Sequence, residues 1–325
     1  SNRTIAFFIT AKYNDALPFY RMEKILNRSG LVVPRATLSN LAISAGRAIG
    51  DLIEMMNRDI VRSPVMVMDE TTVQVLKQGA GPPGKSYMWA AVGYRNGKPI
   101  HRFAYHKNRS GSFADKLLEG FSGYLQSDGY SGYTHLEGHR DITRVGCFAH
   151  IRRRFVESMK VTGQGGKAQE AVDLIAKIYH TEKECRGLLE NGSMNEQEFV
   201  STRKERMAPI FAEFRSWLMA RSYDTAPQTL LGKAVAYAQS QYDAAIRFVD
   251  HVLLQPDTNI VENAIRPFVV GRKNWLFSGS PHGAHVSAGL YSLIETAKAN
   301  GHEPYAYLAY LFEQLPLCRT ESERE

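Results

Sequence analysis

The sequence lacks the features that would place it in several special classes of protein. Its 325 residues include three cysteines, Cys147, Cys185 and Cys318, which are odd in number and widely spaced. This pattern excludes a disulfide framework and suits a reducing cytoplasm. No apolar run approaches the roughly 20 residues that span a bilayer, so we expect no membrane segment. The start has neither the charged nor the apolar region of a signal peptide.

The composition is that of a globular protein with a modest excess of positive charge. Hydrophobic residues make up 44% of the chain, which is enough to bury a sizeable core. The formal net charge of +7 permits a polyanionic partner but does not establish one. The positions of particular residues must therefore decide the function.

Residues 1–62 have helical spacing. Phe19, Met22, Ile25 and Leu26 repeat at that spacing, "NRSG" interrupts it, and the period then resumes. A helix, a glycine-containing turn and a second helix are typical of a DNA-binding helix-turn-helix. They are equally typical of a plain helical hairpin, and both interpretations stay open.

Residues 63–155 change to the spacing of strands. "SPVMVMDETTVQVL" predicts a buried strand, and "SYMWAAVGYRNGKPIHRFAYHK" predicts two strands joined at Asn96-Gly97, a strong hairpin signal. A short helix, two short strands with a loop or helix between them, and another helix follow. This order is that of the ribonuclease-H-like fold.

The rest of the chain returns to helical spacing. Residues 156–255 predict a helical insertion subdomain, residues 256–316 return to the core as helices, and residues 317–325 predict a disordered tail. We therefore predict an α/β protein. It has a ribonuclease-H-like mixed-sheet core (63–155 and 256–316), a large helical insertion and an N-terminal helical region.

Two aspartates follow predicted strands. Asp69 ends the apolar run "VMVM", and Asp128 ends a short strand before a glycine-rich loop. One such aspartate would mean little, because Asp is a common turn former. Two of them on neighbouring strands could converge on one Mg²⁺, which prefers carboxylate oxygens. A third carboxylate would allow two metal ions.

Glu262 is the third candidate, although local sequence favours a structural role for it. With Asn259 as N-cap, Glu262 would complete a capping box, or it could pair with Arg266 one turn on. Glu295 competes for the catalytic role, but its apolar neighbours indicate a helix edge. Glu70 should point away from Asp69, because side chains alternate along a strand.

Several long motifs occur together in a fixed order. The chain resembles the insertion-sequence-66 family of bacterial transposases from about residue 10 to residue 315. The segments that carry the resemblance are "KYNDALPFYRMEKIL", "MDETTVQVL", "YLQSDGYSGY", "CFAHIRRRF", "NIVENAIRPFVVGRKNWLFSGSPHGA" and "LYSLIETAKANGHEPYAYLAYL". Two details depart from the family pattern: Thr258-Asn259 and Glu262-Asn263 surround the glutamate, and "CFAH" replaces the commoner Cys-Trp-Ala-His.

The resemblance implies a catalytic core of the DDE type. Asp69, Asp128 and Glu262 would form the acidic triad and bind two Mg²⁺ or Mn²⁺ ions. The reaction implied is metal-assisted phosphoryl transfer, which cuts DNA at the transposon ends and joins the freed ends to target DNA. The implied partners are double-stranded DNA, as terminal inverted repeats and target, and further copies of the chain in a homo-oligomer. The implied location is the bacterial cytoplasm.

Basic residues near these acids are candidates for DNA contacts. Arg152 and Arg153 open a helix, and Arg266, Arg272 and Lys273 follow the glutamate, where they could neutralise phosphates. As a solvated helix face, the arginine run would need no such explanation. Cys147-x-x-His150 supplies only two of the four ligands that structural zinc requires. The resemblance instead implies that His150 lies near the scissile phosphate.

Two other functions are compatible with the same sequence. The chain could be a DNA-binding or assembly protein that keeps the fold without catalysis, although the presence of all three acids argues against this. It could also be a nuclease that hydrolyses DNA without strand transfer. Joining of cut ends to a target distinguishes a transposase from such a nuclease.

Overall fold

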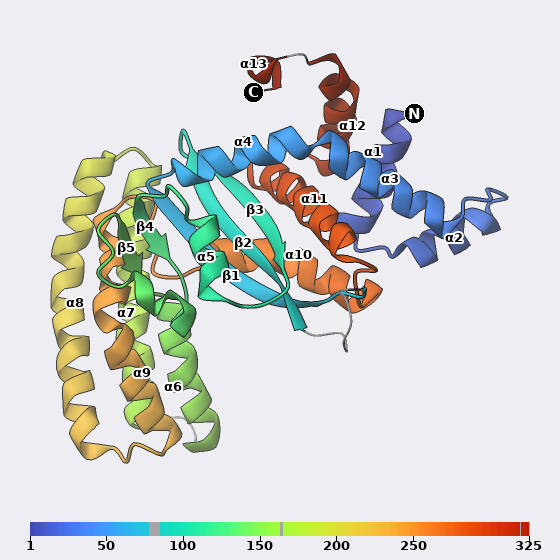
Figure 1. Cartoon of the computed structure of the whole chain (residues 1–325). Coiled ribbons are helices and arrows are strands. Elements are labelled where there is room, and N and C mark those ends of the chain that lie inside the picture. The colour runs from blue at the N-terminus through green and yellow to red at the C-terminus, as the bar shows by residue number, and fades with distance from the viewer. Residues whose placement is uncertain (78–84, 163–164, 319, 325) are drawn as a thin grey trace. The chain divides into compact units, whose positions relative to one another are not determined.

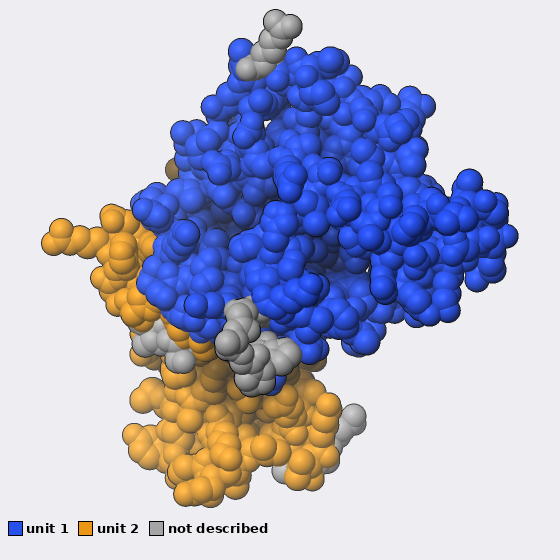
Figure 2. Space-filling view, turned by 45° about the vertical axis from the view of Figure 1, so that its right-hand side comes forward, with its two compact units in different colours: residues 1–123, 259–325 blue, residues 124–258 orange. Residues whose placement is uncertain are grey.

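The computed structural model describes residues 1–77, 85–162, 165–318 and 320–324. The chain divides into two units (Figure 2): unit 1 comprises residues 1–123 and 259–325, and unit 2 comprises residues 124–258. Unit 1 is thus built from two chain segments that are separated in sequence by the whole of unit 2. Among the described residues, no helix is long and apolar enough to cross a membrane.

Four helices open unit 1, as the spacing predicts. They are α1 (Asn2–Tyr13), α2 (Phe19–Arg28), α3 (Arg35–Ala48) and α4 (Gly50–Val61) (Figure 1). The chain turns after α2 within "NRSG", where Gly30 has a φ of 78° that favours glycine. Phe8, Met22 and Leu38 form a small core shared by α1, α2 and α3. DNA binding by these helices stays a prediction.

The central strands of unit 1 form an antiparallel meander. They are β1 (Val65–Gln74), β2 (Lys85–Arg95) and β3 (Lys98–His106). Asn96 and Gly97 join β2 to β3 with φ angles of 52° and 76°, as a two-residue type I′ turn requires. The predicted hairpin is confirmed. Within unit 1 the strand order is β3-β2-β1, and the predicted α/β class is confirmed.

Helices from both chain segments of unit 1 complete it. They are α5 (Gly111–Leu117), α10 (Asn259–Trp275), α11 (Pro281–Ala299), α12 (Pro304–Gln314), η3 (Leu315–Leu317) and α13 (Glu321–Arg324). Helix α11 packs along β3, where the hydroxyls of Ser292 and Thr296 accept hydrogen bonds from the backbone N–H groups of Phe103 and His101 at 2.8 and 2.9 Å. These bonds satisfy donors that an edge strand would otherwise leave exposed.

The sequence predicts a disordered tail over residues 317–325, and this stays a prediction. The described residues there include the short helix α13. Arg324 pairs with Asp51 at 2.6 Å, and Glu321 pairs with Arg58. These ion pairs connect α13 to α4.

Unit 2 consists mainly of long helices. Its elements are β4 (Gly123–Gln126, whose first residue ends a segment of unit 1), η1 (Ser131–Leu136), β5 (Ile142–Val145), α6 (Phe148–Thr162), α7 (Lys167–Glu190), α8 (Glu196–Asp224), α9 (Leu230–Ala245) and η2 (Ile246–Asp250). Phe148, Phe214 and Phe248 are fully buried in its core. Division by contacts is not division by function, so the predicted domain boundaries stay a prediction.

A buried histidine between β3 and α11 makes the stability of unit 1 depend on pH. Neither ring nitrogen of His101 has a hydrogen-bond partner among the described residues. Burial, with a smaller contribution from the charge of Lys298, lowers the pKa of His101 from 6.5 to about 4. The unfolded imidazole therefore takes up a proton at a higher pH than the folded one. The stabilisation is complete above about pH 6.5 and is lost as the pH falls towards 4.

We expect His101→Leu to remove this pH dependence. Between pH 7 and pH 5, the free energy of unfolding of the wild-type protein should fall by about 2 kcal/mol more than that of the variant. Urea unfolding at the two pH values, followed by circular dichroism, measures the difference. An equal fall in both proteins would show that His101 does not control the acid sensitivity.

Candidate active site

Asp69 lies within β1 and not at its end. The strand continues to Gln74, and Asp69 pairs with Ala90 of β2. The predicted strand end, set where the apolar run stops, is therefore wrong. The β-branched residues of "TTV" continue the pairing with β2 after the run has ended. What changes at Asp69 is burial, because it is the first partly exposed residue of the strand.

The Asp69 side chain projects from the face of the sheet that α10 and α11 cover. Residues directly opposite in antiparallel strands share a face, and Asp69 is opposite Ala90, which is opposite Phe103. The Phe103 ring lies 5.8 Å from that of Tyr291 in α11, measured between centroids. Tyr291 in turn lies 5.3 Å from Phe268 of α10. The aromatic contacts thus connect the face of Asp69 to the helix that carries Glu262.

Glu70 projects from the opposite face. It is opposite Trp89, whose ring contacts Phe113 of α5 at 5.7 Å. The Glu70 side chain is 1% exposed and pairs with Arg109. The expectation that Glu70 points away from Asp69 is confirmed, and its ion pair gives it a structural role.

Helix α10 presents its apolar residues to the core, as predicted. Val261, Ile265 and Phe268 are buried, whereas Glu262 is half-buried and Arg266 is exposed. The helix begins at Asn259 itself, one residue earlier than a capping role for that residue implies. Such boundaries vary by a residue or two with the criterion.

The C-terminal end of α10 is attached to β1. Nη1 of Arg272 donates to the hydroxyls of Thr71 and Thr72, both at 3.1 Å, and to the Thr72 carbonyl. Just after the helix, the N–H of Ser278 donates to the Gln74 carbonyl at 2.9 Å. The helix and the strand are therefore joined at two successive points along β1.

The packing of α10 on β1 also shows where Glu262 and Asp69 lie along these two elements. Figure 1 shows α10 and β1, which pack together, running in the same general direction. Glu262 is about 15 Å before Arg272 along the helix, and Asp69 is about 7 Å before Thr71 along the strand. Both carboxylates thus lie on the same side of the Arg272–Thr71 contact. Unit 1 alone carries two of the three predicted acids on a pair of packed elements.

Asp128 begins the loop after β4 in unit 2. The strand ends at Gln126, and the N–H of Ser127 still donates to the Val145 carbonyl at 3.1 Å. The Asp128 carboxylate accepts from the N–H of Tyr130 at 3.0 Å, as in an Asx turn. The predicted position just after a short strand is correct to within two residues.

Tyr237 of α9 borders this loop, and sequence analysis did not find it. A Cβ added at Gly129 would stand 2.5 Å from the Tyr237 hydroxyl, so that position must be glycine for the ring to approach. Burial, and secondarily the charge of Asp128, raise the pKa of Tyr237. The Arg154 guanidinium lies 5.2 Å from the centre of the same ring. The only local signal was the glycine after Asp128.

The arginines at the start of α6 lie near different neighbours. Arg152, Arg153 and Arg154 are all exposed. Arg154 faces Tyr237 and the Asp128 loop, whereas Arg152 is close enough to Tyr179 of α7 to act on its pKa. The structure therefore connects Arg154, which was not among the predicted DNA contacts, with the Asp128 loop. The predicted DNA contacts of Arg152 and Arg153 stay predictions.

Cys147 and His150 interact with each other. Nδ1 of His150 lies 3.2 Å from the Cys147 sulfur, which also accepts a hydrogen bond from the Thr258 hydroxyl at 3.4 Å. Burial raises the pKa of the Cys147 thiol, which therefore stays protonated. A protonated thiol is a poor metal ligand. The placement of His150 near a scissile phosphate stays a prediction.

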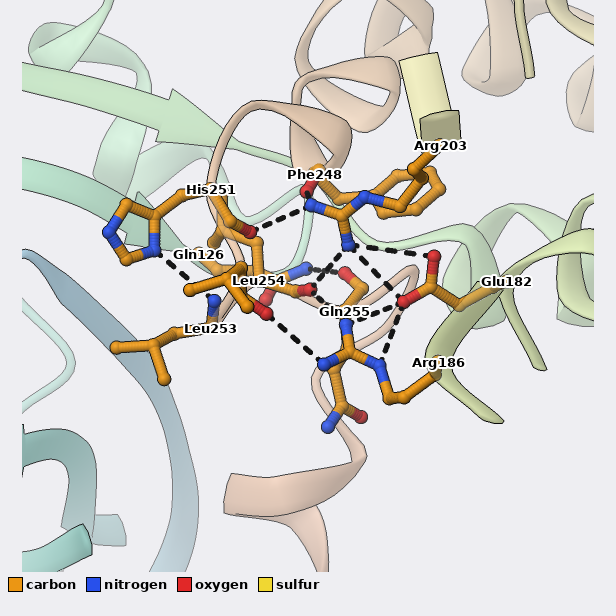
Figure 3. Close-up of polar contacts among 10 residues, drawn as sticks. Gln126, Glu182, Arg186, Arg203, Phe248, His251, Leu253, Leu254 and Gln255 are labelled. Atoms are coloured by element: carbon orange, nitrogen blue, oxygen red, sulfur yellow. Dashed lines mark hydrogen bonds and ion pairs between the residues drawn. The ribbon is translucent and has the colours of Figure 1, made fainter. Parts of the chain in front are cut away.

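A buried charge network fixes the segment of unit 2 that leads to α10. Arg203 of α8 is fully buried (Figure 3), and it donates to Glu182 of α7 at 3.2 Å. Its other bonds go to the carbonyls of Leu254, Phe248 and His251, at 2.8 to 3.1 Å. His251 and Leu254 follow the short helix η2, so the arginine supplies their carbonyls with donors that no helix or strand provides.

Two further side chains hold the same segment. Arg186 donates to Glu182 at 2.6 Å and to the Leu254 carbonyl at 3.1 Å. Gln126, at the end of β4, donates to the Gln255 carbonyl at 2.7 Å (Figure 3). The first and last parts of unit 2 are therefore bonded to each other.

Glu295, the competing acid, already has a partner. It is 5% exposed in α11, and its carboxylate accepts two bonds from the Lys298 ammonium at 3.0 and 3.1 Å. Burial raises the pKa of Glu295, and Lys298 partly offsets this effect. A buried carboxylate paired within its own helix is better explained by structure than by catalysis.

The predicted binding of Mg²⁺ or Mn²⁺ stays a prediction. Among the described residues, no three or more His, Cys, Asp or Glu side chains are grouped so that they could hold a metal ion. Mg²⁺, however, is usually held by one or two carboxylates, with waters and substrate phosphates completing its shell. Asp69 and Glu262 in unit 1 supply carboxylates of that kind.

Comparison with known proteins identifies the family. Residues 1–286 match the family described as "Transposase IS66 family", and residues 292–325 match "IS66 C-terminal element". The chain therefore belongs to the IS66 family of transposases.

Three proteins of Sinorhizobium fredii are similar along most of this chain. The uncharacterized protein y4jD is 30% identical over 95% of the chain and 61% of its own length. The uncharacterized protein y4qI is 29% identical over 100% of the chain and 61% of its own length. The uncharacterized protein y4hP is 23% identical over 94% of the chain and 57% of its own length. The chain thus spans about three fifths of the length of these relatives.

Removal of one partner from the buried network should destabilise unit 2. We expect Glu182→Ala to lower the free energy of unfolding by about 3–5 kcal/mol, because it leaves the buried Arg203 without its counter-charge. Glu213→Ala is a matched control, since it breaks an exposed pair between the same two helices, with Lys177 at 2.9 Å. The control should cost at most about 1 kcal/mol. Equal losses in urea unfolding would contradict a special role for the network.

Proposed function

We propose that this chain carries the catalytic region of a DDE transposase, which cuts DNA at transposon ends and transfers the cut strand to target DNA. The observation that carries the proposal lies in unit 1. In a member of the IS66 family, Asp69 projects towards the face covered by the helix that contains Glu262. A purely structural role for Glu262, as a helix cap, would not require its helix to pack on the strand of Asp69.

Three carboxylates would hold the metal in this proposal. Asp69 and Glu262 of unit 1 and Asp128 of unit 2 would bind two Mg²⁺ or Mn²⁺ ions. When bound, the ions would activate the attacking oxygen and stabilise the charge on the leaving oxygen. The backbone bond from Tyr130 to Asp128 and the packing of β1 would keep two of the carboxylates in fixed orientations.

Basic side chains would bind the DNA. Arg266 and Lys273 are exposed on α10, and Arg152 and Arg153 are exposed on α6, where they can reach phosphate oxygens. Arg272 is also included, although part of its guanidinium is engaged by β1. The partners in this proposal are double-stranded transposon ends, target DNA and further copies of the chain.

Substitution of each proposed metal ligand tests the function. We expect Asp69→Asn, Asp128→Asn and Glu262→Gln to reduce cleavage of pre-nicked end DNA in Mg²⁺ at least a hundredfold, because each amide lacks the charge that holds the ion. Circular dichroism and DNA binding should stay unchanged. Glu295→Gln is the control, and once shown to be folded it should retain cleavage.

The outcomes distinguish the alternatives. Full cleavage by Glu262→Gln would refute the proposed triad and favour Glu295. Wild-type binding to DNA without any cleavage in Mg²⁺ or Mn²⁺ would favour a non-catalytic DNA-binding protein. Cleavage without joining of the ends to a target plasmid would favour a hydrolytic nuclease.

A further inference from the structure

Unit 1 contains a hollow at the end of β1 that the proposed triad does not use. Its volume is about 300 Å³, and it is open to solvent. The residues that line it come from β1, from the start of β2 and from the end of α10 and the residue after it: Thr72, Val73, Gln74, Lys85, Arg272, Lys273 and Leu276. Three of these side chains are cationic and none is acidic.

The three cations have no described acidic partner. In the described part of the chain, Lys85, Arg272 and Lys273 form no ion pair, whereas many other arginines do, such as Arg144 with Glu137. All hydrogen bonds of Arg272 go to the neutral oxygens of Thr71 and Thr72. Partial burial lowers the pKa of Arg272. Positive charge is thus concentrated here without a counter-charge.

The walls of the hollow are fixed by the backbone. Gln74 and Lys85 are directly opposite in the ladder between β1 and β2. On the other side of β1, the N–H of Leu76 donates to the Ser278 carbonyl at 2.9 Å. Leu276 has a φ of 67°, a left-handed conformation that turns the chain from α10 into this pairing. Little conformational entropy would be lost when a ligand binds between such elements.

We infer that this hollow is a binding site for a backbone phosphate of DNA, with Lys85 and Lys273 contacting the phosphate and Arg272 held at its floor by β1. The inference rests on the proposed function, because it takes the DNA strand as the source of the phosphate. Gln74 and Thr72 add side-chain donors, and the exposed Leu276 supplies apolar surface for the sugar.

The site is separate from the proposed metal ligands. Thr72 is about 10 Å beyond Asp69 along the strand. By strand alternation, Thr72 and Gln74 project from the same face as Glu70, which is the face opposite to Asp69. The hollow would thus set the position of the DNA strand and would take no part in the bond change.

Salt dependence of DNA binding tests the site without any need for catalysis. Binding of a duplex of arbitrary sequence is measured by fluorescence anisotropy in EDTA, over a range of salt concentrations, with folding checked by circular dichroism. We expect Lys85→Ala and Lys273→Ala each to reduce the slope of log K against log salt by about 0.9, and the double variant by about 2.

Lys98→Ala is the matched control. Lys98 is exposed in the same antiparallel meander, at the Arg95–Lys98 turn, which is the opposite end of β2 from Lys85. This variant should keep the wild-type slope. An unchanged slope in the double variant, or an equal reduction in Lys98→Ala, would overturn the inference.

A second measurement identifies the source of the phosphate. Calorimetric titration with inorganic phosphate should give no more than millimolar affinity for the wild-type protein. Tighter binding that the double variant loses, with an unchanged DNA slope, would assign the hollow to free phosphate and overturn the inference. If the triad variants lose cleavage and the lysine variants reduce the salt slope as expected, the result supports this site independently of the catalytic residues. If the lysine variants reduce the slope but the wild-type protein does not cleave DNA, only the proposed catalysis is refuted.

Discussion

Packing of α10 against β1 is the contact on which unit 1 depends. It joins residues as far apart in the sequence as Thr71 and Arg272, which are 201 positions apart. The Arg272 guanidinium joins α10 to the hydroxyls of Thr71 and Thr72 in β1, and Phe268 of α10 packs on Tyr291 of the neighbouring α11. Since the entropy of closing a loop grows only slowly with its length, a long insertion is tolerated here if its two ends return to one place.

Unit 2 satisfies that condition with its own contacts. The Gln126 side chain bonds to the Gln255 carbonyl, and the N–H of Phe148 donates to the Pro256 carbonyl at 2.8 Å. The Arg203–Glu182 network then holds the irregular residues before Gln255. If apolar residues replaced Arg203 and Glu182, the carbonyls that Arg203 bonds would lose their donors. Replacement of a buried ion pair that bonds no backbone carbonyls does not carry this cost.

The fold was predictable where the decisive signals are local. Alternation along β2 and β3, the Asn96-Gly97 turn and the helical periodicities depend on residues a few positions apart, and they gave correct elements. The end of β1 was misplaced because its second half is held by pairing with β2 and Ser278, which an apolar run does not report. The ion pairs of α13 likewise involve residues distant in the sequence, Asp51 and Arg58.

The residues of the candidate site were likewise predictable only where the signal is local in the sequence. Asp69, Asp128 and Glu262 could be selected because each has a recognisable neighbourhood in the chain, and the family motifs contain all three. Tyr237 could not be selected, since only the tertiary fold brings α9 to the Asp128 loop. Lys85 was missed for a similar reason. Its partners in the hollow come from the far end of the chain.

The proposed chemistry explains why acids lie close to cations that have no acidic partner among the described residues, on adjoining elements of unit 1. Carboxylates such as Asp69 and Glu262 repel a phosphate, and at a few ångströms this costs several kcal/mol near a protein surface. A bound metal removes that repulsion only at the reacting group. Neighbouring phosphates need their own positive charges, and α10 and the adjoining strands supply them at Arg272, Lys273 and Lys85. One packed pair of elements can then fix both the distance of the DNA from the metal ligands and its direction along β1.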